Sequence, residues 1–309
     1  MTTPVTLIRG RHPRAHELPR TPKPNWLKVR APGSPGYLQL KHLMQDLDLR
    51  TVCEEASCPN IGECWNHGTA TFMILGDTCT RSCGYCNVIH GQPRPVDQGE
   101  PARVAQAVAH LDLAHVVITS VDRDDLPDGG ASVFASTIRA IDASTPACRV
   151  EVLIPDFRGR AGDLETVLDA GPGILNHNIE TVERLYRTAR PGGSYTRALT
   201  LLERAKRHRP DTPTKSGLMV GLGEERREVE ATLADLRTVG CNILTIGQYL
   251  RPSVAHLPVA RYYTPDEFAG LKEIAQRLGF GHVESGPLVR SSYHAHEQTE
   301  SFNRRPSPL

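Results

Sequence analysis

The chain has 309 residues, enough for a large hydrophobic core, and its formal net charge is +1. A charge so close to zero gives no general attraction to nucleic acid or to an anionic membrane, so we expect neither as a partner. The longest apolar runs are far shorter than the roughly 20 residues that cross a bilayer. Eight cysteines in a chain of this size argue against a disulfide scaffold, which is typical of small secreted domains. We therefore expect a reducing, cytoplasmic compartment.

The first segment, residues 1–36, is basic and rich in proline. Its prolines would interrupt an amphipathic helix of the kind found in transit peptides, and it ends in a Pro/Gly-rich run at 31–36. We expect a flexible arm that precedes the first cysteine region at 37–69.

Three cysteines follow in a C-x4-C-x5-C pattern, as Cys53, Cys58 and Cys64. A closed structural zinc site needs four ligands, and three thiolates do not supply them. Three thiolates can instead hold three irons of a [4Fe–4S] cluster, which leaves the fourth iron for a ligand from elsewhere in the chain or from a cofactor.

A short apolar run at 71–75 predicts a buried strand, and a second cysteine triplet follows it directly. Cys79, Cys83 and Cys86 form a C-x3-C-x2-C pattern. Parallel α/β sheets carry their chemistry at the C-terminal ends of the strands, where this loop is predicted to lie. A zinc site or a purely electron-transfer site is the alternative, although zinc motifs are usually built from pairs of C-x2-C units.

Strands and helices are predicted to alternate through the region 70–282. Helical segments with one apolar face separate the apolar runs, which indicates a parallel sheet with right-handed crossovers. Six such units are fewer than the eight of a closed (β/α)8 barrel, so we predict a laterally open, partial (β/α)6 barrel of the TIM type. The six predicted strands are 71–75, 116–119, 149–154, 174–179, 217–220 and 243–246.

Two glycine-containing segments follow strands of this region. Asp128, Gly129 and Gly130 come after the second strand, and a glycine-rich run at 217–224, which contains Gly221 and Glu224, overlaps the fifth. Glycines allow a backbone to approach a ligand closely, although each run taken alone is more often an ordinary turn.

The C-x3-C-x2-C motif, with Tyr85 before its last cysteine, resembles the signature of the radical S-adenosylmethionine (SAM) superfamily. The resemblance implies that Cys79, Cys83 and Cys86 hold a [4Fe–4S] cluster whose open iron binds SAM. Reductive cleavage of SAM would then give a 5′-deoxyadenosyl radical that abstracts hydrogen from an unactivated carbon. The resemblance also implies a SAM pocket formed by Tyr85 and the two glycine segments, with Asn178 a further candidate.

The segment 53–65 closely resembles the N-terminal cluster motif of the lipoyl synthase family, and the Arg-Ser-Ser-Tyr motif at 290–293 resembles its C-terminal motif. The resemblance extends over about residues 25–295. It implies an auxiliary [4Fe–4S] cluster on Cys53, Cys58 and Cys64 with a serine on the fourth iron. The residues alone do not separate Ser291 from Ser292, and the family pattern favours Ser292. We expect the C-terminal segment, 283–309, to bring this motif in as a strand.

The resemblance further implies the reaction, which is insertion of two sulfur atoms at C6 and C8 of a protein-bound octanoyl-lysine. The auxiliary cluster would supply the sulfur, and SAM and both [4Fe–4S] clusters would be the cofactors. The implied partners are octanoylated lipoyl carrier domains or a glycine cleavage H-type protein, a small redox protein as electron donor, and iron–sulfur assembly factors. The alternatives are a radical SAM enzyme that uses its second cluster for relay or anchoring, and a non-catalytic iron–sulfur carrier.

Overall fold

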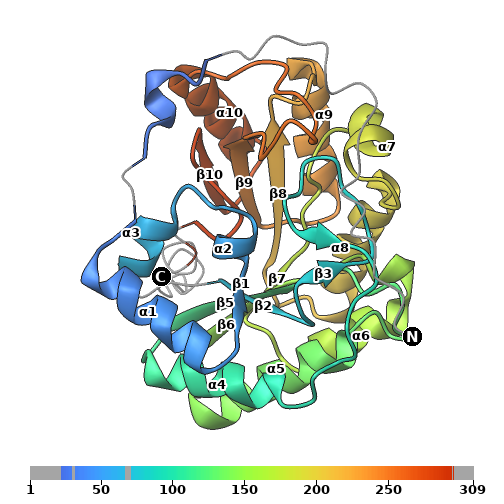
Figure 1. The fold of residues 1–309 in the computed structure, drawn as a ribbon. Coiled ribbons are helices and arrows are strands. Elements are labelled where there is room, and N and C mark those ends of the chain that lie inside the picture. The colour runs from blue at the N-terminus through green and yellow to red at the C-terminus, as the bar shows by residue number, and fades with distance from the viewer. Residues whose placement is uncertain (1–21, 30–31, 67–70, 294, 296–309) are drawn as a thin grey trace, which may run out of the picture.

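The computed structural model describes residues 22–29, 32–66, 71–293 and 295, so most of the basic arm and the tail beyond 296 lie outside it. Its centre is a sheet of eight strands in the order β1-β2-β5-β6-β7-β8-β9-β10 (Figure 1). β1 runs antiparallel to β2, and every other neighbouring pair is parallel. The strand bounds are β1 (Arg50–Thr51), β2 (Thr71–Ile74), β5 (His115–Ser120), β6 (Arg149–Leu153), β7 (Ile174–Asn176), β8 (Thr214–Val220), β9 (Ile243–Gln248) and β10 (His282–Gly286).

Helices follow the strands and cover the outer face of the sheet (Figure 1). Short 3-10 turns η1 (Asn25–Leu27), η2 (Phe157–Gly159) and η3 (Glu183–Leu185) and a small pair of strands, β3 (Thr78–Cys79) and β4 (Ile89–His90), complete the fold. The helices are α1 (Pro35–Asp46), α2 (Val52–Glu55), α3 (Ile61–Asn66), α4 (Glu100–His110), α5 (Ala131–Ser144), α6 (Ala161–Asp169), α7 (Tyr186–Ala189), α8 (Tyr195–His208), α9 (Arg226–Thr238) and α10 (Pro265–Arg277).

The predicted partial barrel is confirmed. Each of the six predicted strands is present in the sheet, and β10 adds a seventh parallel strand after α10. Within the described residues β1 and β10 stand at opposite ends of the strand order, so the sheet does not close there. Figure 1 shows α2 and α3 on the side between these two end strands.

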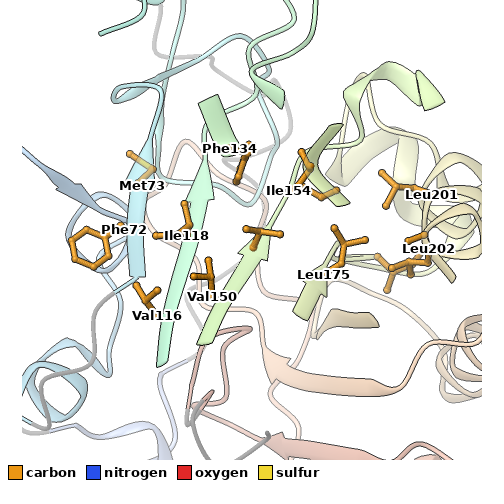
Figure 2. Packing of buried hydrophobic residues seen from close by; sticks show 14 of the residues in the cluster. Phe72, Met73, Val116, Ile118, Phe134, Val150, Ile154, Leu175, Leu201 and Leu202 are labelled. Atoms are coloured by element: carbon orange, nitrogen blue, oxygen red, sulfur yellow. The ribbon is translucent and has the colours of Figure 1, made fainter. Parts of the chain in front are cut away.

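The main hydrophobic core lies between the sheet and its outer helices. Figure 2 shows side chains of β2, β5 and β6, among them Phe72, Ile118 and Val150, in the same cluster as Leu201 and Leu202 of α8. Burying an aliphatic or aromatic side chain of this size contributes roughly 1.5–3 kcal/mol, so this layer fixes the strands and with them the loops at their C-terminal ends. None of the helices in the described ranges combines the length and apolar character that a bilayer crossing requires.

Buried charge occupies the inside of the barrel. The Glu151 carboxylate accepts hydrogen bonds from Lys215 Nζ at 2.8 Å and from Asn176 Nδ2 at 3.0 Å, and His115 lies 3.5 Å away. Burial alone would raise the pKa of Glu151, but Lys215 and His115 more than offset this and lower it to about 2. The group therefore stays ionised and links β5, β6, β7 and β8 from within.

The segment 183–208 forms three helical pieces, η3, α7 and α8, and Pro191, Gly192 and Gly193 interrupt the helical period between the last two. One prediction about an element is wrong. The Arg-Ser-Ser-Tyr motif was expected in a strand, whereas β10 ends at Gly286 and residues 291–293 form a turn. Pro287 follows Gly286 and has no N–H to continue the ladder.

Candidate active site

Cys79, Cys83 and Cys86 line a single cavity of about 150 Å³ at the C-terminal edge of the parallel strands. Cys79 ends β3, and the other two lie in the loop between β3 and β4. The cavity wall also contains residues that directly follow β5, β6 and β7, so it belongs to the barrel mouth. The position predicted for this triplet is confirmed.

The three thiols suit an iron cluster chemically. Burial is the main reason that the pKa of each is raised to about 12, and neighbouring negative charge adds to it. Thiolates at these positions therefore need a cation to stabilise them. Among the described residues no three His, Cys, Asp or Glu side chains converge on a single metal ion. A cubane cluster places a different requirement on its ligands, since each thiolate binds a different iron.

A buried arginine holds the cysteine loop against the barrel. Arg81 donates to Asp124 at 2.7 and 2.8 Å and to Asp156 at 2.6 Å, and lies 3.4 Å from Asp122. The backbone N–H groups of Arg81 and Asp122 donate to Cys79 Sγ at 3.4 and 3.3 Å. Burial would lower the pKa of Arg81, but the three carboxylates raise it, so the guanidinium is permanently charged. The ion pairs connect the loop to the residues that follow β5 and β6.

The loop after β9 holds the same cysteine loop from another side. The Leu257 N–H donates to the Gly84 carbonyl at 2.9 Å, and His256 Nε2 donates to the Cys86 carbonyl at 3.0 Å. The Gly84 N–H donates in turn to the Ala189 carbonyl at 2.9 Å. The backbone between the last two cysteines is therefore fixed on two sides by hydrogen bonds.

Besides Arg81, the cavity wall carries a buried acid, Glu180, and a second arginine, Arg190. Glu180 accepts from Asn178 Nδ2 at 3.1 Å, and Arg190 Nη1 donates to the Asn178 carbonyl at 2.9 Å. Burial raises the pKa of Glu180, and Arg190, Asn178 and Tyr85 counteract that increase. Sequence reasoning identified Tyr85 and Asn178 but missed Asp122 and Glu180, although both acids lie within three residues after a predicted strand.

The other triplet lies on and between two short helices. Cys53 lies in α2 and Cys64 in α3, with Cys58 in the connection. Burial is the main reason that the pKa of Cys53 is raised to about 11 and that of Cys64 to about 12, and the neighbouring thiols of the triplet contribute to both increases. The sequence triplet is therefore also a cluster in space, and the same argument for a cationic iron partner applies.

The C-terminal turn is tied to these two helices. Asn60 Nδ2 donates to the Leu288 carbonyl at 2.7 Å, and the Tyr293 hydroxyl donates to Glu63 at 3.1 Å. The charge of Arg290 acts on Cys58 in the direction that lowers its pKa, although burial, the larger effect, raises it. These contacts join residues more than 200 positions apart and bring the Arg-Ser-Ser-Tyr motif to the first triplet.

The two neighbouring serines of this motif have different surroundings. The Ser291 hydroxyl donates to Asn178 Oδ1 at 2.9 Å, so it is already used. A Cβ on Gly217 would come within 2.6 Å of that amide oxygen and 2.8 Å of Ser291 Oγ, which explains the glycine in β8. The Ser292 hydroxyl makes no hydrogen bond to any of the described residues. Because Asn178 also lines the cavity, it links the two cysteine sites.

The remaining predicted pocket residues lie outside the cavity lining. Asp128 accepts from the N–H groups of Gly130 and Ser132 at 2.9 Å and so begins α5. Glu224 accepts from the N–H groups of Gly221 and Leu222 at 2.6 and 2.9 Å. Both carboxylates stabilise local turns. The contacts of Asp128, Gly129, Gly130, Gly221 and Glu224 with SAM stay predictions.

Comparison with known proteins agrees with this geometry. The radical SAM superfamily model matches residues 73–236, and a model of the N-terminal domain of lipoyl synthase matches residues 8–58. The chain is 60% identical to lipoyl synthase of Rubrobacter xylanophilus over 97% of this chain and 91% of that one. It is 59% identical to lipoyl synthase of Koribacter versatilis over 91% of this chain and 92% of that one.

Solved structures show the same fold at low sequence identity. Methylornithine synthase superposes with a TM-score of 0.53 at 13% identity, covering 80% of this chain and 81% of that one. Streptococcus suis SuiB bound to S-adenosylmethionine superposes with a TM-score of 0.53 at 10% identity, covering 74% and 54%. Because the sequence relatives are so similar along nearly their whole length, the chain belongs to the lipoyl synthase family of the radical SAM superfamily.

Proposed function

We propose that this chain catalyses the insertion of two sulfur atoms at C6 and C8 of a protein-bound octanoyl-lysine. Family membership supports sulfur insertion as the activity. The observation that carries the finer proposal is the contact between the two cysteine sites. Ser291, beside the first triplet, donates to Asn178, which lines the cavity of the second. A chain lying past Asn178 would therefore be within reach of both sites.

Cys79, Cys83 and Cys86 would hold the [4Fe–4S] cluster that binds SAM. When bound and reduced, this cluster and SAM supply the radical that removes hydrogen from the octanoyl chain. The methionine end of SAM carries one amino and one carboxylate group, and the cavity wall offers acids and a guanidinium for them. Asp122 and Glu180 suit the amino group and Arg190 suits the carboxylate, while Asn178 and Tyr85 fix the position of Glu180.

Cys53, Cys58 and Cys64 would hold the auxiliary cluster, which supplies the sulfur. We propose Ser292 as the fourth ligand because Ser291 already donates to Asn178. An alkoxide is more basic than a thiolate, so a serine ligand is readily protonated and released. Release suits a cluster that loses its own sulfur during the reaction.

The proposed partners follow from this chemistry. Octanoylated lipoyl carrier domains or a glycine cleavage H-type protein would present the substrate, a small redox protein would supply electrons, and iron–sulfur assembly factors would restore the auxiliary cluster. The cytoplasm is the proposed compartment, because all eight cysteines are free thiols.

The direct test is incubation of the anaerobically reconstituted protein with SAM, a strong reductant and an octanoyl-lysyl peptide. The expected products are 5′-deoxyadenosine and a peptide whose mass increases by two inserted sulfur atoms. Formation of 5′-deoxyadenosine without sulfur insertion would contradict the proposal and favour a radical SAM enzyme with a different use for its second cluster.

A further inference from the structure

A second cavity, of about 270 Å³, lies between the first turn of α6 and the first three turns of α8. Figure 1 shows these two helices as neighbours beside the barrel. Because α6 follows β6 and α8 precedes β8, both helices begin at the strand edge that carries the cysteine loop. The first turn of a helix has backbone N–H groups without intrahelical partners and a positive partial charge. α6 has no side-chain cap for these groups.

Three arginines line this cavity and use only part of their hydrogen-bonding capacity. Arg160 pairs with Asp163 through Nε, and its Nη2 is buried with no hydrogen-bond partner in the part of the chain that the structure describes. Arg204 donates from Nη1 to the Gly159 carbonyl at 2.8 Å and forms no ion pair with a described acid. Arg197 donates from Nη1 to Asp156 at 2.9 Å. The remaining guanidinium N–H groups are available to a ligand.

Among the described residues, Asp156 is the one carboxylate that lines the cavity. Its Oδ2 is paired with Arg197 and its Oδ1 with Arg81, so its negative charge is compensated. Thr196 and Thr200 also line the cavity. The wall therefore combines the three arginines and these hydroxyl-bearing residues with the apolar side chains of Leu164 and Leu201.

The loop that forms one side of the cavity has an unusual backbone. Phe157, Arg158 and Gly159 have φ values of 45°, 55° and 81°, all in the left-handed region. For the two residues that are not glycine this backbone conformation is strained. Such strain is typical of loops held in place for binding, and here it directs the Gly159 carbonyl to Arg204.

We propose that this second cavity binds a small phosphate-bearing anion. A phosphoryl group presents several acceptor oxygens, which suits the guanidinium groups and hydroxyl-bearing residues of this cavity. The volume is close to the lower limit of small-molecule sites, so the ligand is a phosphate or a compact phosphate ester. This proposal is independent of the sulfur-insertion activity.

The test is a calorimetric titration of the SAM-saturated, reconstituted protein with inorganic phosphate and, separately, with pyrophosphate. We expect saturable binding of at least one of them, weakened about tenfold or more by Arg204→Gln and severalfold by Thr200→Val. Arg207→Gln is the matched control, because Arg207 is on the same helix, 70% exposed, and pairs with Glu203 instead. We expect it to leave binding unchanged.

Three results would overturn the proposal. The first is the absence of saturable binding of either anion, and the second is equal loss of affinity in the Arg204 and Arg207 variants. The third is equally tight binding of succinate, which would show that the site does not select phosphoryl oxygens. Circular dichroism of each variant must match that of the parent protein, and Thr200→Val provides a second variant with a smaller structural change.

Discussion

The two cysteine sites are held by different kinds of interaction. The loop of Cys79, Cys83 and Cys86 is fixed to the barrel by the buried ion pairs of Arg81 and by backbone hydrogen bonds. The site of Cys53, Cys58 and Cys64 lies on short helices outside the main strands, and single hydrogen bonds attach it to the C-terminal turn.

This difference suits the two proposed roles. A site that must cleave SAM repeatedly benefits from a rigid loop, and buried charges that are paired with one another resist separation. A site whose cluster is consumed has to open and be rebuilt, and single hydrogen bonds contribute only about 1 kcal/mol each. The barrel site is therefore held by buried ion pairs, whereas weaker contacts attach the other site to the C-terminal turn.

The largest expected effect separates the two triplets. Cys83→Ala should abolish SAM cleavage and all product, because the cluster that binds SAM would lose a ligand. Cys58→Ala should abolish sulfur insertion and still allow 5′-deoxyadenosine to form. Each variant should retain about four irons per chain instead of about eight. Iron analysis and product chromatography measure both. Loss of SAM cleavage in a Cys58 variant that keeps its other cluster would refute the separation.

The two serines give the next largest effect. Ser292→Ala should abolish sulfur insertion, because the auxiliary cluster would lose its fourth ligand, while 5′-deoxyadenosine still forms. Ser291→Ala is the matched control, since it loses one hydrogen bond to Asn178, worth about 1 kcal/mol, and should reduce the rate only severalfold. Mass spectrometry of the peptide distinguishes them. A greater loss of sulfur insertion in Ser291→Ala than in Ser292→Ala would assign the ligand to Ser291.

Arg81 tests the rigidity of the barrel site. Arg81→Ala removes the ion-pair partner of Asp122 and Asp124 and one of the two partners of Asp156, and it should lower the free energy of unfolding by about 3–5 kcal/mol. Arg81→Lys keeps the charge and loses the paired geometry, so its effect should be intermediate. Anaerobic urea unfolding of the reconstituted protein measures both.

The control for Arg81 is an arginine with an exposed partner. Arg103→Ala breaks an ion pair with Asp97, whose side chain is 55% exposed. Loss of this ion pair should lower the free energy of unfolding by no more than about 1 kcal/mol. Similar losses for the Arg81 and Arg103 variants would contradict a special role for the buried ion pairs.

The smallest expected effect concerns the attachment of the C-terminal turn. Asn60→Ala removes the donor to the Leu288 carbonyl and should weaken this attachment by about 1 kcal/mol. The auxiliary cluster should then be lost to an iron chelator severalfold faster, with the other cluster unaffected. Ser136→Ala, on the exposed face of α5, is the control. Equal acceleration at both clusters would argue against separate attachment.

Local pattern predicted much of the fold. Apolar runs and helical periodicity identified the six strands from β2 to β9, because each is a property of consecutive residues. α1 was missed, although Ser34 caps it, Pro35 begins it, and Leu40 and Met44 are buried on one face. β10 was missed because only its second residue is strongly buried.

The candidate site likewise has features that local sequence predicts and features that it does not predict. The cysteines were found because their spacing is local, whereas the pairing of Arg81 with Asp156 and of Ser291 with Asn178 joins distant parts of the chain. Motif resemblance also does not determine where a side chain points. Glu224 is an example, since it was predicted to contact SAM and its carboxylate binds the N–H groups of its own turn.

The most direct test of the central claim is a single turnover with protein reconstituted in isotopically labelled sulfide. We expect both sulfur atoms of the lipoyl product to carry the label, and we expect iron of the auxiliary site to be released as product forms. The other cluster should remain intact in the same sample. Unlabelled product, or labelled product formed by a Cys58→Ala variant, would contradict the account.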